Sequence, residues 1–310
     1  MASIGANWKR YFLLLLFLIL ILMAIMAGYL PTYYVFLLTS IFMYIVITVS
    51  WATFCGSTGY ISLASAAFFG AGCYVTAILG NGLPLPLIIV LGGLASLFLA
   101  FLVGLSSLRI RGIFFAIFTL GLSECLRNLV DWLEITISGR IGRWIIAVDY
   151  ITCFRVMLII LVMTLLTAYV MRHSKFGLAL RSIGENEEAA AHVGINVNAV
   201  KIIAFAISSF WMGATGAIMV TQWSYVDAAI AFDILNSFMP ALMALFGGIG
   251  TIFGWVLGAI LFTIIAELLL TEFPYYYMLI FGVVIIGVIL FLPSGLSGVV
   301  AKWRKGGLAG

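Results

Sequence analysis

Charged residues are scarce in this sequence. Lys, Arg, Asp and Glu make up 8% of the 310 residues, whereas hydrophobic residues make up 65%. So small a polar fraction does not cover the surface of a soluble globule of this length, and no stretch has the composition of a water-soluble domain. The net charge of +4 is therefore interpreted as a topology signal, and no nucleic-acid partner is expected.

Histidine and cysteine are also rare, with two and four copies respectively. His173 and His192 both fall in the longest polar interval, where solvated side chains are the rule. The cysteines lie in or beside apolar segments and lack metal-ligand spacing. We expect packing residues rather than a disulfide framework or a metal site at Cys55, Cys73, Cys125 and Cys153.

Sequence motifs of enzyme chemistry are absent as well. The chain has no Walker A lysine motif and no nucleophile elbow. We therefore expect a non-catalytic protein with no cofactor of its own. If ATP drives its action, another chain must bind the ATP and its Mg²⁺.

Long apolar runs are what the sequence has instead. A helix needs about 20 apolar residues to cross a bilayer, and in lipid it satisfies its own backbone groups. We predict an all-α polytopic bundle of about 8–10 membrane segments, forming one domain over residues 1–310, with loops at 133–150 and 223–236. The expected segments are residues 11–28, 33–54, 55–73, 87–108, 112–132, 151–171, 202–222, 238–246, 251–270 and 278–292.

The basic residues predict the orientation of these segments. If the N-terminus is cytoplasmic, eleven of the fifteen Lys and Arg residues face the cytoplasm, including all four in residues 172–201. This agrees with the positive-inside rule. It places both termini in the cytoplasm of a multi-pass protein of the cell (inner) membrane. Arg140 and Arg143 are the clear exceptions, because they lie in an outer loop.

Two segments are rich in glycine and other small residues. Small residues let helices approach closely in lipid, and glycine also interrupts helices near a substrate path at the middle of the membrane. Both explanations fit here. The candidate pathway residues are Gly59, Ser62, Ser65, Gly70 and Gly72 in the first segment and Gly247, Gly248 and Gly250 in the second.

Acidic residues within the expected spans could bind substrate or carry protons. Glu124 and Arg127 are three residues apart, so they share a helical face and can pair. A direct substrate role is the alternative for this pair. A self-sufficient secondary transporter would use Glu124, Glu267 or Asp233 as a proton relay. These acids lie near segment ends, which disfavours that class.

The polar interval 172–201 lies between two expected spans. It carries Arg172, Lys175, Arg181 and Lys201 as well as Glu185, Glu187 and Glu188. We predict a short helix of about ten residues here, capped by Ser182 or Asn186, carried by Ala189, Ala190 and Ala191, and ended by Gly194 with a positive φ. Such a helix outside the membrane suits docking onto another protein. An amphipathic connector on the lipid surface is the alternative.

Residues 188–194 read Glu-Ala-Ala-Ala-His-Val-Gly, an E-A-A-x-x-x-G string in the polar interval. This string has the form of ABC-importer coupling loops, and with its surroundings it resembles the permeases of branched-chain amino-acid ABC importers. The surrounding strings at 174–183 and 194–197 fit the same family, and the resemblance extends in order from about Tyr44 to Gly298. Further matching strings are residues 59–74, 109–121, 245–259 and 292–298.

This resemblance implies a set of partners and roles. Such permeases pair with a second, related permease within membrane lipid, two ATPase subunits attach on the cytoplasmic side, and an external solute-binding protein delivers the substrate. The ATPase-coupling residues would be Glu185, Glu187, Glu188, Ala189, Ala190 and Gly194. Arg140 and Arg143 would contact the solute-binding protein; two solvated charges or contacts to lipid are the alternative.

The sequence departs from the family pattern at two places. Residues 136–142 stand where many members have a Thr-Gly-Gly-Ser-x-Gly-like string, and residues 63–67 read Leu-Ala-Ser-Ala-Ala where Leu-Gly-His-Ala-Ala is usual. Both lie in outward or pathway regions, so they leave the substrate open. Branched-chain or other small amino acids are expected, with urea, short amides or carboxylates as alternatives.

Overall fold

The computed structural model describes residues 28–80, 82–110, 112–276, 279 and 282–283. Within them, seven helical stretches are long and apolar enough to cross a membrane. The all-α polytopic prediction is confirmed. The expected segments 11–28 and 278–292 lie almost entirely outside the described residues. The seven stretches are α2 (Thr32–Thr58), α4 (Leu85–Ser107), α5 (Ile113–Ser138), α6 (Tyr150–His173), α9 (Val197–Trp223), α12 (Ile252–Glu272) and the pair α10 (Ala228–Ala231) and α11 (Leu235–Gly247).

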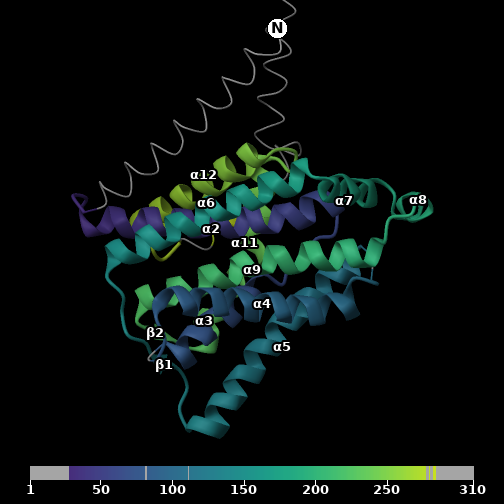
Figure 1. The fold of residues 1–310 in the computed structure, drawn as a ribbon. Coiled ribbons are helices and arrows are strands. Elements are labelled where there is room, and N and C mark those ends of the chain that lie inside the picture. The colour runs from purple at the N-terminus through teal and green to yellow at the C-terminus, as the bar shows by residue number, and fades with distance from the viewer. Residues whose placement is uncertain (1–27, 81, 111, 277–278, 280–281, 284–310) are drawn as a thin grey trace, which may run out of the picture.

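The helices form two groups around α2 and α9 (Figure 1). Helices α6, α11 and α12 pack on α2, while α4 and the shorter α3 (Ser65–Leu79) pack on α9, and α2 contacts α9 between the groups. Helices α2 and α9 are accordingly the most buried of the long helices. Helix α5 is the most exposed and leans away from the bundle in Figure 1.

Glycines set the contact between α3, α4 and α9. A Cβ atom on Gly72 of α3 would overlap the backbone of Gly213 on α9, and one on Gly92 of α4 would meet Ala217 of α9. Small residues at such positions allow the close backbone approach on which helix packing in lipid depends. Gly72 therefore permits the close contact of α3 with α9.

One end of the bundle contains a small sheet that the sequence analysis did not predict. Strand β1 (Arg143–Trp144) pairs antiparallel with β2 (Tyr225–Val226), with Arg143 opposite Val226. The expected loop at 133–150 starts later, because α5 continues to Ser138 and Gly139 ends it in the left-handed conformation. The expected loop at 223–236 is mostly ordered structure, since it holds the last residue of α9, β2, α10 and the first two residues of α11.

The interval 172–201 lies at the opposite end of the bundle (Figure 1). It contains two helices, α7 (Lys175–Glu185) and α8 (Glu187–His192), before α9 begins. Helix α7 is amphipathic and packs on α2, with Gly177, Leu180 and Ile183 buried. Helix α8 projects beyond the bundle.

Candidate functional site

The predicted ten-residue helix at 185–194 is wrong in its extent. Asn186 adopts an extended backbone (φ −157°), so it ends α7 at Glu185 and starts the separate helix α8. Its side chain accepts hydrogen bonds from the N–H groups of Glu188 and Ala189, both at 3.0 Å. The Asn186 cap and the positive φ of Gly194 (+90°) are confirmed. Ser182 lies inside α7 and does not cap a helix; the Ser174 side chain is the cap of α7.

The predicted ATPase-coupling residues divide into two groups in the structure. Glu185, Glu188, Ala189 and Gly194 are exposed. Ala190 is buried at 3% exposure, and the Glu187 side chain is 17% exposed and bonds to Lys201. Two apolar side chains that the sequence analysis missed, Leu178 and Val193, are exposed at this end.

Glu187 meets a lysine that is almost fully buried. The Lys201 side chain is 1% exposed, and its Nζ donates to Glu187 Oε1 at 2.6 Å. The same Nζ donates to the carbonyl of Leu108 at 2.9 Å and to the hydroxyl of Tyr60 at 3.1 Å. The Tyr60 hydroxyl in turn donates to Glu187 Oε2 at 2.8 Å. We call these four groups the Lys201 cluster.

The burial of Lys201 was not predicted from the sequence. Lys201 was counted among the charges at the cytoplasmic end, and in the structure its side chain is buried in α9 with three acceptors for its three N–H donors. Burial of an ammonium group is tolerated only with such pairing. A lysine one turn inside a long apolar run is the signal that could have indicated a buried partner. The partner residue Tyr60 is 141 residues away in sequence.

Tyr60 belongs to an unwound segment between α2 and α3, residues 59–64, which we call the α2–α3 linker. Its backbone groups bond to side chains of neighbouring helices. The N–H of Leu63 donates to Thr119 of α5 at 2.9 Å, and the carbonyl of Ser62 accepts from the indole of Trp51 at 2.7 Å. Irregular backbone persists among membrane helices only when other protein groups satisfy it in this way.

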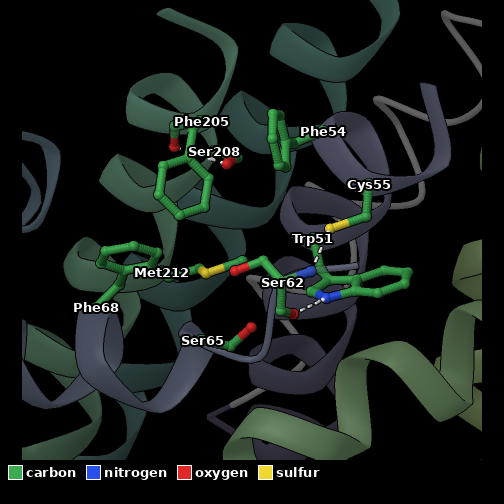
Figure 2. Close-up of a pocket in the computed structure, with 9 residues that line it drawn as sticks. All are labelled: Trp51, Phe54, Cys55, Ser62, Ser65, Phe68, Phe205, Ser208 and Met212. Atoms are coloured by element: carbon green, nitrogen blue, oxygen red, sulfur yellow. Dashed lines mark hydrogen bonds between the residues drawn. The ribbon is translucent and has the colours of Figure 1, made fainter. Parts of the chain in front are cut away.

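The linker borders a small cavity (Figure 2). Figure 2 shows Ser62 and Ser65 facing Met212 of α9, with the Trp51 indole bonded to Ser62. The cavity measures about 10 Å³, which holds no more than one water molecule. Its walls come from α2, the linker, α3 and α9. The lining residues are Trp51, Phe54, Cys55, Ser62, Ser65, Phe68, Phe205, Ser208 and Met212.

The other predicted pathway glycines lie elsewhere. Gly59 has φ +73° and ends α2, while Gly70 packs on Phe232 and Gly72 on Gly213. They serve packing and helix termination here. None of these three is among the residues that line the cavity.

The second glycine-rich string is not a break at the middle of the membrane. Residues 248–251 form the turn between α11 and α12, and the guanidinium of Arg172 donates to the carbonyl of Gly250. Because Arg172 is at the end of α6 that leads into α7, this turn lies at the same end as α7 and α8. Gly247 packs against Gly254 and Gly258 of α12, where a Cβ would overlap the backbone. Gly248, with φ +96°, shapes the turn.

Arg143 has a partner within the chain at the end that carries the sheet. Its Nε donates to Glu134 Oε1 at 3.1 Å, and Glu134 is 3% exposed. The second Glu134 oxygen accepts from the N–H of Gly142 at 2.8 Å. This pair explains an arginine in this loop without an external protein. Arg140 is exposed.

The remaining acids of interest occupy surface or capping positions. The predicted pair of Glu124 and Arg127 is confirmed at 3.7 Å, with both side chains 36% exposed. Glu267 accepts a hydrogen bond from Tyr33, and Asp233 accepts one from the N–H of Leu235. Among the described residues, no three His, Cys, Asp or Glu side chains are grouped to hold a metal ion.

Seven membrane-length helical stretches with two short helices at one end describe a multi-pass membrane protein. The chain belongs to the family described as the branched-chain amino acid transport system permease component, which matches residues 33–289. It is therefore an ABC-transporter permease of the inner membrane, and the resemblance predicted from the sequence is confirmed.

Named relatives agree with this family assignment. The chain is 27% identical over 292 residues, 83% of its length and 68% of the relative, to the high-affinity branched-chain amino acid transport system permease protein LivM of Salmonella typhimurium. It is 26% identical to the corresponding Escherichia coli protein over 82% of the chain and 67% of the relative. An autoinducer 2 import system permease protein, LsrC of Yersinia pseudotuberculosis, is 29% identical over 59% of the chain and 54% of the relative. No solved structure matches.

Proposed function

We propose that this chain is one permease subunit of an ATP-driven importer for branched-chain or other small amino acids. It lines the translocation path together with a second, related permease, and two separate ATPase subunits hydrolyse the ATP. An external solute-binding protein delivers the substrate. The observation that carries the proposal is that α8 projects from one end of the bundle and is bonded, through the Lys201 cluster, to the linker beside the serine-lined cavity.

The substrate class rests on the relatives, since the LivM proteins that match most of the chain are high-affinity branched-chain amino acid permeases. Urea, short amides or carboxylates form the second candidate class, because residues 63–67 and 136–142 depart from the family pattern. Uptake of labelled leucine by the reconstituted importer should be competed by isoleucine and valine. Competition by urea or acetamide alone would overturn the amino-acid assignment.

The orientation is part of the proposal. The end with α7 and α8 also carries Arg109, Lys175 and Arg181, so the positive-inside rule places it in the cytoplasm together with both termini. In a Cys125→Ser background, which removes the exposed native thiol, a cysteine at Ser182 should react only with reagents that enter the cell. A cysteine at Ser138, at the other end of the bundle, should react from outside. Labelling of position 182 by an impermeant reagent in intact cells would reverse the orientation.

The outer loop offers a contact for the solute-binding protein at Arg140. Arg140→Glu should reduce stimulation of ATP hydrolysis by that protein severalfold at low salt, and the loss should shrink as salt screens the charge. The matched change Arg143→Glu should instead lower the thermal stability of the permease, because it leaves the buried Glu134 carboxylate without its counter-charge. Unchanged stimulation of the Arg140 variant at low salt would remove Arg140 from the interface.

A further inference from the structure

We infer that the Lys201 cluster is the mechanical link through which α8 moves the α2–α3 linker, so that Lys201, Glu187 and Tyr60 are positioning residues of the transport cycle. The inference rests on the proposed function, because it requires that an ATPase pulls on α8. It assigns these three side chains an inward role, whereas the exposed residues of α8 meet the partner.

The geometry joins three elements at one nitrogen atom. Nζ of Lys201, on α9, bonds to the carboxylate of Glu187 at the first turn of α8, to the hydroxyl of Tyr60 at the start of the linker, and to the carbonyl of Leu108 just after α4. The Tyr60–Glu187 bond closes the network directly between α8 and the linker. Charge-assisted hydrogen bonds of this kind are among the strongest that side chains form.

Among the described residues, α8 packs mainly on its sequence neighbours α7 and α9. It is six residues long, and Ala190 is its buried residue. A helix this short is not stable alone, so its position depends on its attachments. The carboxylate of Glu187, bonded at both oxygens, is therefore a principal route by which displacement of α8 reaches the bundle.

The displacement reaches the cavity within a few residues. Tyr60 lies two residues before Ser62, whose carbonyl is held by Trp51, and the Leu63 N–H is held by Thr119 of α5. The Tyr60 ring also packs edge-on against Phe115 of α5, with centroids 5.5 Å apart. A shift at the Tyr60 hydroxyl thus acts on the backbone that carries Ser62 and on α5 together.

A purely structural role for the cluster makes a different prediction. If the cluster only stabilised the fold, weakening it would lower the amount of assembled importer but not the number of substrate molecules moved per ATP. If it transmits motion, assembled importer would still hydrolyse ATP while transport per ATP fell. The informative readout is therefore the coupling ratio, measured on assembled complex at matched abundance.

Tyr60→Phe is the cleanest variant, because it removes only the hydroxyl and keeps the ring against Phe115 and over the Lys201 ammonium, 4.4 Å away. With the complete importer in proteoliposomes, Tyr60→Phe and Glu187→Gln should each lower transport per ATP roughly fivefold or more. A factor of about five is the lower end of the coupling usually found between distant sites. The double variant should lose no more than the stronger single variant, since both remove the same link. The control is Glu124→Gln, which breaks an exposed pair on α5 and should leave the ratio unchanged.

Each outcome decides the question. Normal coupling in assembled Tyr60→Phe and Glu187→Gln importers would overturn the inference and leave the proposed function intact. Failure of Tyr60→Phe to assemble would also overturn it, because the cluster would then be a fold anchor. Absence of ATP-dependent transport in the unaltered importer would instead overturn the proposed function.

Discussion

Replacing Gly72 with valine should abolish most of the folded permease. Gly72 of α3 faces the backbone of Gly213 on α9, and Gly92 of α4 approaches the same point. Overpacking costs about 1–3 kcal/mol when side chains can move aside. Here the opposing atoms belong to the backbone, so α3 and α9 must separate. We therefore expect the free energy of unfolding to fall by an amount at or above the top of that range.

The measurement is the yield and thermal stability of detergent-solubilised protein. Gly72→Ala should give a smaller loss than Gly72→Val, because it adds one carbon instead of three. The matched control is Gly121→Val in α5, where an added Cβ meets nothing within 4 Å. If Gly72→Val were as stable as Gly121→Val, the close approach of α3, α4 and α9 would be wrong, and a pathway role for Gly72 would regain support.

Charge reversal at Glu188 and a bulky residue at Gly194 should uncouple transport from ATP hydrolysis. Glu188 is exposed on α8, so a lysine there would place the wrong charge at the proposed contact with an ATPase. Gly194 holds φ at +90° just before α9, a conformation that costs other residues about 1 kcal/mol or more. Valine would therefore misdirect the connection into α9. Neither residue lines the cavity.

Both variants should enter the membrane and pair with the second permease. We expect ATPase co-purification to be lost, or transport per ATP to fall roughly tenfold, within the usual range of coupling between sites. The control for charge is Glu272→Lys at the far end of α12, and the control for backbone strain is Gly139→Val, where φ is +64°. Normal ATPase association and coupling in both variants, with membrane abundance matched by blot, would make α8 an ordinary connector.

The positions of most spans follow from the sequence, because apolar run length is a local property. The expected segments 33–54, 87–108 and 151–171 correspond to α2, α4 and α6 with ends displaced by a few residues. Helix ends were harder to predict, since they depend on single capping residues. Asn186 ends α7 and starts α8, so the helix expected over residues 185–194 is confined to 187–192, and the helix α7 before it was not expected.

The roles of individual glycines and charges were not predictable in the same way. A glycine beside a path and a glycine in a helix contact have the same local sequence, and only the atoms opposite Gly72 or Gly247 distinguish them. Lys201 likewise has the local sequence of a basic residue at the membrane surface. Its acceptors Tyr60 and Leu108 are 141 and 93 residues away in the sequence, and only the folded structure shows that they contact it. Periodicity and composition carry no information about such distant partners.

The source of energy for uptake tests the central claim most directly. Vesicles should be prepared with both permeases, with or without the ATPase subunits, and supplied with ATP inside and with loaded solute-binding protein outside. The account predicts leucine accumulation only when ATPase and ATP are both present, and none under a proton gradient alone. Accumulation driven by a proton gradient in vesicles that lack the ATPase would contradict it and identify a self-sufficient secondary transporter.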